Sequence, residues 1–488
     1  MWVEADIRGG LPTFTVVGLA DKAVREARDR VRAAVVNSGF EFPAKRITVN
    51  LAPAYLRKAG PGFDLPIAMA VLAASGQLAV EALSGCAVEG ELSLTGELRA
   101  TRGTLAIAEG AARHGLGRLL LPVTRAREAA LVPALEVLGV ATLQEAVEVA
   151  RGDREPAPVP EPDPRPEDAG EDADLSDVRG HNALVPALEI VAAGGHNLFM
   201  HGPPGTGKTM IARRLPSLLP PLSNDEAIAV TRVHSVAGLH GGSGLVARRP
   251  FRAPHHTISA SGLVGGGAPP APGEATLAHH GVLFLDELSE FARPALEALR
   301  QPLEDGHVTI VRAQRLTVFP TRCTLVAASN PCPCGREERA CTCSAADLAR
   351  HRRRLSGPLL DRIDVSLTVG RPSAAAMRRQ AAPRSADVRA GIVAARERQA
   401  ARLAGTGLTC NAQLTPRLLR ELANATRPAQ RRLDAVHDRG HLSARGHGRI
   451  LRVARTIADL AGSDAVRPEH IDQAASLRLD DRALSAAA

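Results

Sequence analysis

The chain has 488 residues, of which 45% are apolar, and a formal net charge of +8. This length is enough for about three globular domains, and no apolar run reaches the ~18 residues of a membrane-spanning helix. The seven cysteines are an odd number, and the first residues lack a basic segment followed by an apolar stretch. We therefore expect a cytoplasmic protein with reduced thiols and no signal peptide.

The charge is unevenly distributed along the chain. Between Asp153 and Asp177, ten acidic residues stand against two arginines, a local charge of −8 that leaves +16 on the remainder. A basic body favours a polyanionic partner such as nucleic acid. The alternative is that the many arginines reflect genomic base composition, which would also explain the shortage of lysine. Aromatic residues are rare, so phosphate contacts rather than base stacking should dominate.

Residues 1–150 are expected to form a first domain of mixed α and β structure. Strands are predicted at residues 13–17 and 46–51, and a buried helix at 67–74. The chain opens within a segment that resembles a strand, so we expect the first strand of this domain to be missing. Helical spacing over residues 21–37 places five apolar side chains on one face: Val24, Ala27, Val31, Ala34 and Val35.

Residues 151–174 are expected to form an acidic linker. Six prolines alternate there with charged and small residues. Such a composition favours an extended chain that cannot bury a core. An alternative role for it is that of an acidic decoy for a DNA channel.

A glycine-rich segment at residues 202–209 follows an apolar run at 197–200 and precedes a helix-like segment at 210–219. Strand, glycine-rich loop and helix in this order are typical of a phosphate-binding loop, whose backbone N–H groups surround a phosphate chain. Lys208 can reach the β- and γ-phosphates, and Thr209 can ligate Mg²⁺. We expect ATP to contact the following loop residues: Gly202, Pro203, Pro204, Gly205, Thr206, Gly207, Lys208 and Thr209.

A second apolar run, residues 282–285, ends in Asp286 and Glu287. The run is typical of a buried parallel strand. An acidic residue at the exit of such a strand can hold Mg²⁺, which assigns Asp286 to the metal together with Thr209. Glu287 is expected to polarise the attacking water. The two motifs in this order predict nucleotide hydrolysis.

Three further segments resemble motifs of AAA+ ATPases. Residues 327–331 resemble the sensor-1 strand, which implies a catalytic role for Asn330. Residues 355–364 resemble the arginine-finger segment of the branch that includes magnesium chelatase and the MCM helicases, and Arg362 is the candidate finger. Residues 442–451 resemble the sensor-2 helix, which implies that Arg445 contacts phosphate. The alternatives are a surface ion pair of Arg362 with Asp361 or Asp364, and simple solvation of Arg445.

The segments 249–257 and 330–335 give the closest resemblance, and the whole pattern is similar to the YifB/ComM family of magnesium-chelatase-like proteins. This resemblance implies an α/β AAA+ P-loop core at residues 175–370 with a helical lid at 371–488. It also implies a hexameric DNA motor that drives branch migration on branched or duplex DNA in recombination or natural transformation. A finger from a neighbouring subunit would then complete each ATP site.

Residues from about 52 to 122 resemble the proteolytic domain of Lon, an α+β domain (ribosomal S5 domain 2-like). The similarity lies in residues 58–69 and 90–99. Lon uses a serine nucleophile with a lysine base. Here Asp64 falls at the serine position and Leu105 near the lysine, so we expect no peptidase activity. The implied role is a ring-stabilising or DNA-binding tier.

Two insertions are candidates for DNA contacts. Residues 257–274 are rich in glycine and proline and suit a hairpin in a ring pore. Residues 306–319 alternate as two strands with a basic turn. We expect Arg312 and Arg315 in that turn to contact phosphate, as in the DNA hairpin of related helicases. The alternative is an exposed basic turn.

Four cysteines lie within twelve residues: Cys332, Cys334, Cys341 and Cys343. Four thiolates can close a tetrahedral structural Zn²⁺ site, although the usual spacing is two residues between paired cysteines rather than one. Free reduced thiols and a redox role are the alternatives.

Two other functions compete with a DNA motor. One is a chelatase-type ATPase that remodels a protein partner for metal insertion, but no metal-sensing von Willebrand-type domain is visible. The other is an ATP-dependent protease, which Asp64 and Leu105 disfavour. Stimulation of ATP turnover by DNA separates the first two.

Overall fold

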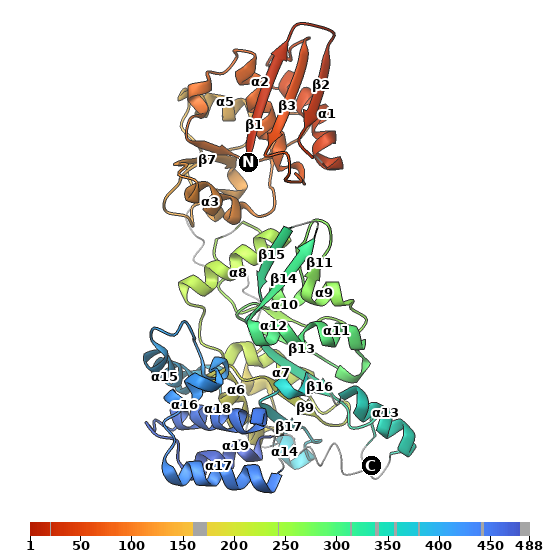
Figure 1. The fold of residues 1–488 in the computed structure, drawn as a ribbon, viewed down its shortest axis with the longest axis vertical. Coiled ribbons are helices and arrows are strands. Elements are labelled where there is room, and N and C mark those ends of the chain that lie inside the picture. The colour runs from red at the N-terminus through yellow and green to blue at the C-terminus, as the bar shows by residue number, and fades with distance from the viewer. Residues whose placement is uncertain are drawn as a thin grey trace. The chain divides into compact units, whose positions relative to one another are not determined.

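The computed structural model describes the chain apart from residues 20, 160–172, 243, 313–314, 337–340, 356–358, 379–380, 441–443 and 479–488. The chain forms two compact units. The first comprises Met1–Glu167 and Asn224–Val246, and the second comprises Asp168–Ser223 and Ala247–Ala488. Their helices and strands are labelled in Figure 1. In the described part of the chain, no helix has the length and apolar character that a membrane crossing requires.

The first unit contains two three-stranded sheets. In one, β3 (Arg46–Ala52) lies between β1 (Trp2–Arg8), which is antiparallel to it, and β2 (Thr13–Val17), which is parallel. The predicted strands at 13–17 and 46–51 are therefore confirmed. The other sheet is parallel, in the order β4 (Cys86–Val88), β7 (Arg118–Pro122) and β8 (Glu136–Val140). A short antiparallel pair, β5 (Glu91–Leu92) and β6 (Leu98–Arg99), completes the strands.

Helix α1 (Lys22–Asn37) confirms the predicted amphipathic helix. The Asp21 carboxylate accepts the Val24 N–H at 2.8 Å and caps its first turn. The five predicted apolar residues are all fully buried. The predicted buried helix at 67–74 is also present, but it begins earlier, at Asp64. The helices of this unit after α1 are α2 (Asp64–Ala74), α3 (Thr104–Arg113), α4 (Ala126–Ala129), α5 (Leu143–Arg151) and α8 (Asn224–Ala237).

Helix α8 belongs to the first unit although it follows the glycine-rich loop in sequence. The Gly103 N–H donates to the Ser235 carbonyl oxygen at 3.1 Å, the Ser235 hydroxyl donates to the buried carboxylate of Glu128, and Arg232 Nε donates to Glu109 at 2.8 Å. The second unit is therefore interrupted in sequence within the segment 175–370 that we expected to be continuous. These contacts are all long-range, so no local pattern marked them.

The second unit is built on a five-stranded parallel sheet with the order β10-β13-β16-β9-β17. Both faces are covered. In β13, Val282 and Phe284 pack into one apolar core, while Leu283 and Leu285 pack into another. A strand buried on both faces has no polar alternation, which explains the uninterrupted apolar run. The strands are β10 (Phe251–Arg252), β13 (Val282–Leu285), β16 (Thr324–Ser329), β9 (Leu198–His201) and β17 (Val365–Thr368).

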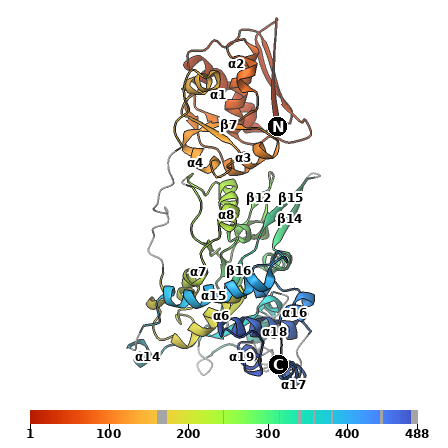
Figure 2. The same ribbon diagram turned by 90° about the vertical axis from the view of Figure 1, so that its left-hand side faces the viewer.

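The predicted hairpin at 306–319 is confirmed. Strand β14 (His307–Arg312) pairs antiparallel with β15 (Arg315–Pro320), and Arg312 lies opposite Arg315. In Figures 1 and 2 the two strands extend away from the core sheet. Residues 313–314 and the side chains of Arg312 and Arg315 lie outside the described residues.

The insertion at 257–274 differs from the simple hairpin that we expected. A short helix, α9 (Ala260–Val264), forms first because the Ser259 hydroxyl accepts the Gly262 N–H at 3.1 Å and caps it. Only then does a small hairpin follow, in which β11 (Gly265–Gly266) pairs with β12 (Ala271–Pro272).

Residues after 371 are helical, as the sequence predicted. Helices α15 and α18 pack against α6, and Figure 2 shows α16, α17, α18 and α19 gathered together. The helices of the second unit are α6 (Val185–Gly194), α7 (Lys208–Leu218), α9, α10 (Glu274–Leu277), α11 (Arg293–Ala298), α12 (Arg300–Asp305), α13 (Ala345–Leu355), α14 (Ala374–Arg378), α15 (Ser385–Leu403), α16 (Pro416–Leu422), α17 (Arg427–Gly440), α18 (Ala444–Leu460) and α19 (Pro468–Ser476).

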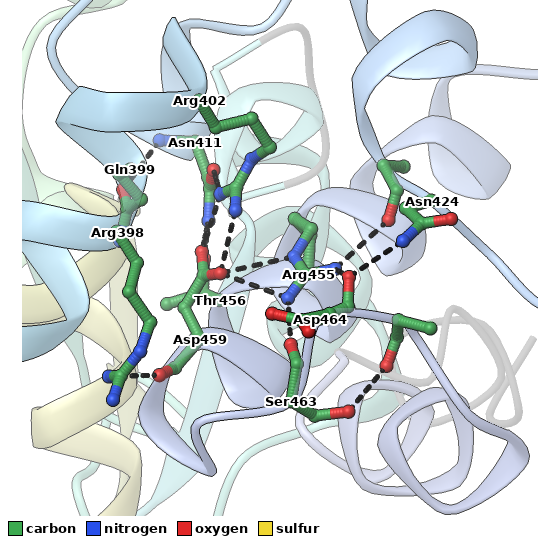
Figure 3. Close-up of polar contacts among 12 residues, drawn as sticks. Arg398, Gln399, Arg402, Asn411, Asn424, Arg455, Thr456, Asp459, Ser463 and Asp464 are labelled. Atoms are coloured by element: carbon green, nitrogen blue, oxygen red, sulfur yellow. Dashed lines mark hydrogen bonds and ion pairs between the residues drawn. The ribbon is translucent and has the colours of Figure 1, made fainter.

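A buried ionic network stabilises this lid (Figure 3). Asp459 on α18 is 1% exposed and accepts hydrogen bonds from Arg455 Nη2 at 2.9 Å, Arg402 Nη2 at 2.6 Å and Asn411 Nδ2 at 2.8 Å. Arg455 Nη1 also donates to the carbonyl oxygen of Asp464 at 2.8 Å. Buried charges persist only when they are paired in this way.

Candidate nucleotide-binding site

The glycine-rich loop connects β9 to α7 and requires its glycines. Gly205 and Gly207 have φ values of +74° and +89°, which side chains rarely adopt. A Cβ at Gly202 would lie 2.0 Å from the carbonyl oxygen of Val369. Helix α7 begins at Lys208, two residues before the predicted start, and its N-cap is Gly207. Because glycine offers no capping side chain, the first-turn N–H groups are left to another acceptor.

Lys208 points into this loop. Its Nζ donates to the carbonyl oxygens of Gly202 at 2.7 Å and Pro203 at 2.8 Å, and to Asn330 Oδ1 at 3.1 Å. Burial lowers the pKa of Lys208, while the carboxylates of Asp286 and Glu287 act in the opposite direction. Phosphate oxygens are stronger hydrogen-bond acceptors than these neutral oxygens. A bound triphosphate can therefore replace them as the acceptors for Lys208 Nζ.

Thr209 and Asp286 are brought together from distant parts of the sequence. The Thr209 hydroxyl donates to Asp286 Oδ2 at 2.6 Å, and Asp286 Oδ1 accepts the Glu287 N–H at 2.9 Å. A hydroxyl and a carboxylate are the oxygen ligands that Mg²⁺ prefers. These two side chains therefore fit the metal that the sequence predicts.

Glu287 lies at the end of β13 in a strained conformation. Its φ of +51° is in the left-handed region, which is uncommon for a residue with a Cβ. Its side chain is 54% exposed, and the imidazole Nδ1 of His256 lies 3.7 Å from Glu287 Oε2. His256 is a neighbour that sequence reasoning missed, since no spacing rule connects the segment 249–257 to the end of β13.

Asn330 directly follows β16. Besides its contact with Lys208, its backbone oxygen accepts a hydrogen bond from His351 Nε2 of α13 at 3.0 Å. The structure thus brings Asn330 to the phosphate-binding loop, where sensor-1 residues are expected. His351 had not been identified from the sequence.

Arg362 and Arg445 are the two candidate arginines, and Arg362 is paired within its own chain. Arg362 forms an ion pair with Glu304 of α12, and its Nε donates to the Arg300 carbonyl oxygen at 3.2 Å. The ion-pair alternative named Asp361 or Asp364 as the partner of Arg362. The side chain of Asp361 lies outside the described residues, and Glu304 is a partner that this alternative did not name. Asp364 instead accepts the Asn197 N–H at 3.4 Å. Arg445 lies exposed at the start of α18.

The four cysteines converge as their spacing suggested. Their sulfur atoms all lie within 4.8 Å of one another. The Sγ–Sγ distance is 3.2 Å for Cys332 and Cys334, 3.7 Å for Cys334 and Cys341, and 3.6 Å for Cys341 and Cys332.

In the first unit, the residues aligned with the Lon dyad have other partners. Asp64 is buried and accepts Arg30 Nε at 2.8 Å and Arg30 Nη2 at 3.0 Å. Burial raises the pKa of Asp64 despite this ion pair. Leu105 is a buried apolar side chain. The geometry is that of a structural ion pair beside an apolar core.

Comparison with known proteins identifies three matching segments. Residues 174–377 match the family described as magnesium chelatase, subunit ChlI. Residues 3–125 match subunit ChlI of Mg-chelatase, and residues 382–478 match the magnesium chelatase subunit ChlI C-terminal family.

Similar proteins extend along nearly the whole chain. The chain is 43% identical over 488 residues to the protein YifB of Escherichia coli, covering 99% of this chain and 94% of that protein. It is 42% identical over 485 residues to the competence protein ComM of Haemophilus influenzae, covering 98% and 94%. A partial match, 26% identical over 206 residues, is to the DNA replication licensing factor Mcm2 of Drosophila melanogaster, covering 39% and 20%.

Proposed function

Because the chain belongs to the magnesium chelatase ChlI family, with YifB and ComM as relatives along its length, we propose that it is an AAA+ ATPase that acts as a DNA motor. The observation that carries the ATPase assignment is that five polar side chains converge at one end of the parallel sheet. Lys208, Thr209, Asp286, Glu287 and Asn330 come from three separate strands or their loops and lie around a loop that glycine alone permits. Ligands of open parallel sheets bind at this edge.

In this proposal the loop N–H groups and Lys208 bind the phosphate chain of ATP. Lys208 exchanges its contacts with loop carbonyl oxygens for phosphate oxygens. Glu287 orients the water and accepts its proton, and Asn330 holds the γ-phosphate. Residues Gly202 to Thr209 form the binding loop, and the carboxylate of Glu287, which directly follows Asp286, is more than half exposed to solvent.

Thr209 and Asp286 are proposed to hold Mg²⁺, since they supply a hydroxyl and a carboxylate already 2.6 Å apart. When bound, this ion neutralises the charge that develops on the phosphate oxygens.

We assign a hexamer, in which Arg362 of one subunit completes the site of its neighbour. To do so, Arg362 would have to exchange its ion pair with Glu304 for a contact with phosphate. Arg445 at the exposed start of the lid helix α18 would contact phosphate from the lid. Stabilisation by such arginines contributes about 10³–10⁵ in rate in related phosphoryl-transfer systems.

DNA is the proposed polymer on which the motor acts. The hairpin β14–β15 extends from the core, and Arg312 and Arg315 are paired in register across the strands next to its turn. The chain outside residues 153–177 carries +16. ComM is a competence protein by name and Mcm2 a DNA replication factor. Branch migration of cytoplasmic DNA during recombination or natural transformation fits these features.

A chelatase-type ATPase that remodels a protein partner is the second candidate, favoured by the three matches to magnesium chelatase subunit ChlI. For the first unit we propose a Lon-like fold without peptidase chemistry, because Asp64 is held by Arg30. The proposed order is this domain at 1–150, an acidic linker at 151–174, the ATPase core at 175–370 and the lid at 371–488. Both candidates require the same ATP site.

The deciding experiment measures ATP turnover with and without a synthetic four-way DNA junction. A DNA motor should hydrolyse ATP faster with the junction and move its branch point. ATP turnover that DNA leaves unchanged would support the chelatase-type alternative. No ATP turnover under any condition would contradict both proposed functions.

A further inference from the structure

The cysteine cluster has the dimensions of a metal site. A tetrahedral zinc ion with four thiolates at about 2.3 Å requires sulfur–sulfur separations of about 3.8 Å. The recorded distances of 3.2, 3.7 and 3.6 Å lie close to this value. They are far longer than the bond of ~2.05 Å in a disulfide, and all four thiols are free.

The backbone around the cluster favours negative charge on sulfur. Backbone N–H groups of Arg336 and Thr342 donate toward the sulfur of Cys334. Four thiolates in so small a space require a cation to offset their charge, and each thiol that ligates it gives its proton to water.

The cluster lies directly against the nucleotide site. Cys332 is 3% exposed and follows Asn330 by two residues. The turn closed by the Gly335 N–H and the Cys332 carbonyl oxygen, at 3.1 Å, contacts the phosphate-binding loop. A Cβ at Gly335 would lie 3.0 Å from Pro204 Cγ, and the φ of +69° at this position favours glycine.

We propose that Cys332, Cys334, Cys341 and Cys343 bind one structural Zn²⁺ ion, which fixes Asn330 and the turn at Gly335 against the phosphate-binding loop. The role in positioning rests on the proposed ATPase function, whereas the metal site does not. The ion is structural because four protein ligands leave no open position for water or substrate. Four sulfur ligands select zinc or an iron–sulfur cluster.

The first test is the metal content of the full chain. We expect one zinc ion per chain in the natural protein and in Cys323→Ala, which removes a half-buried thiol from the same unit outside the cluster. The double variant Cys341→Ser with Cys343→Ser should contain almost none. Cobalt in place of zinc should give the thiolate charge-transfer spectrum of a tetrahedral site. Bound iron, disulfides within the cluster, or a chain without metal would each overturn the assignment.

A second measurement uses the natural protein, so its result does not depend on whether the double variant folds. Modification of the cysteine thiols should release zinc to a coloured chelator in proportion to the cluster thiols modified. Zinc that is released without any loss of these thiols would place the ion elsewhere and overturn the proposal.

The second test separates positioning from metal binding. The double variant should lose about 10²-fold in ATP turnover, the scale of a ~1 Å displacement of catalytic groups, while Cys323→Ala retains it. Loss of zinc with unchanged turnover and nucleotide affinity would remove the positioning role. A zinc-containing natural protein without ATPase activity would instead refute the proposed function and leave the zinc site intact.

Discussion

The Nζ of Lys208 lies 3.1 Å from Oδ1 of Asn330, a contact that joins the phosphate-binding loop to the end of β16. The two residues come from adjacent parallel strands, β9 and β16. Because Asn330 also contacts α13 through His351, the position of the lysine depends on the strand end, the cysteine cluster and a helix together. Changes at any of these should be detectable as altered nucleotide binding.

Replacing Lys208 with alanine should abolish most ATP turnover. The substitution removes the only ammonium that the loop directs inward, and loss of one electrostatic group in such a site costs about 10²–10³ in rate. Turnover by the matched variant Lys45→Ala, an exposed lysine of the first unit, should be normal. Unchanged turnover in Lys208→Ala would contradict the assignment of this loop.

Replacing Glu287 with glutamine should separate binding from hydrolysis. The amide keeps the size of the side chain but cannot accept a proton from water. We expect nucleotide affinity close to that of the natural protein, measured by calorimetry, with turnover reduced at least 10²-fold. Glu290→Gln, on the following turn, is the control. Loss of affinity equal to the loss of turnover would indicate a binding role for Glu287.

Replacing Arg312 and Arg315 together with alanine should weaken DNA binding. Each phosphate contact contributes about one unit to the slope of log affinity against log salt, so the slope should become less steep by about 2. The exposed Arg293→Ala change, on α11, should leave the slope unaltered. If ATP hydrolysis without DNA collapsed while DNA affinity held, the hairpin would have a different role.

Replacing Asp459 with alanine should destabilise the lid. It leaves Arg455, which is 1% exposed, without its carboxylate. Removing one partner of a buried ion pair costs about 3–5 kcal/mol, to be measured as the free energy of unfolding in urea. Asp472→Ala removes a half-exposed partner of Arg432 and should cost at most about 1 kcal/mol. Equal losses for both variants would show that burial of the network contributes little.

The buried Glu89 should make the first unit less stable as the pH rises. Burial raises the pKa of Glu89 from 4.5 to about 7, partly opposed by hydroxyl donors from Thr104 and Thr101. The native state therefore binds the proton more tightly than the unfolded state. This contribution to stability is complete below pH 4.5 and is lost as the pH rises through about 7, amounting to about 3 kcal/mol.

Glu89→Gln imitates the protonated form and tests whether stability falls as the pH rises. It should flatten the pH dependence between 4.5 and 7 and raise stability at pH 8, measured by thermal unfolding at each pH. The exposed Glu136→Gln variant should leave the profile unchanged. A variant less stable than the natural chain at pH 8 would show that the fold stabilises the ionised carboxylate of Glu89, so that its pKa is not raised.

Local sequence determined the elements and the order of the chemical groups. The glycine-rich segment, the apolar run before Asp286 and the helix after Asp21 each follow from interactions within a few residues, namely φ preferences, burial on both sheet faces and an N-cap. For the same reason the β14–β15 hairpin and the convergence of the four cysteines could be anticipated. These features require no knowledge of distant contacts.

Only the tertiary structure decided which distant residues meet. The pairing of Arg362 with Glu304, the position of His256 beside Glu287, and the packing of α8 within the first unit all join segments whose separation follows no local rule. Side-chain contacts between such segments depend on how sheets and helices stack. Their energies are small differences between burial, charge pairing and desolvation, which cannot be read from the residues in chain order.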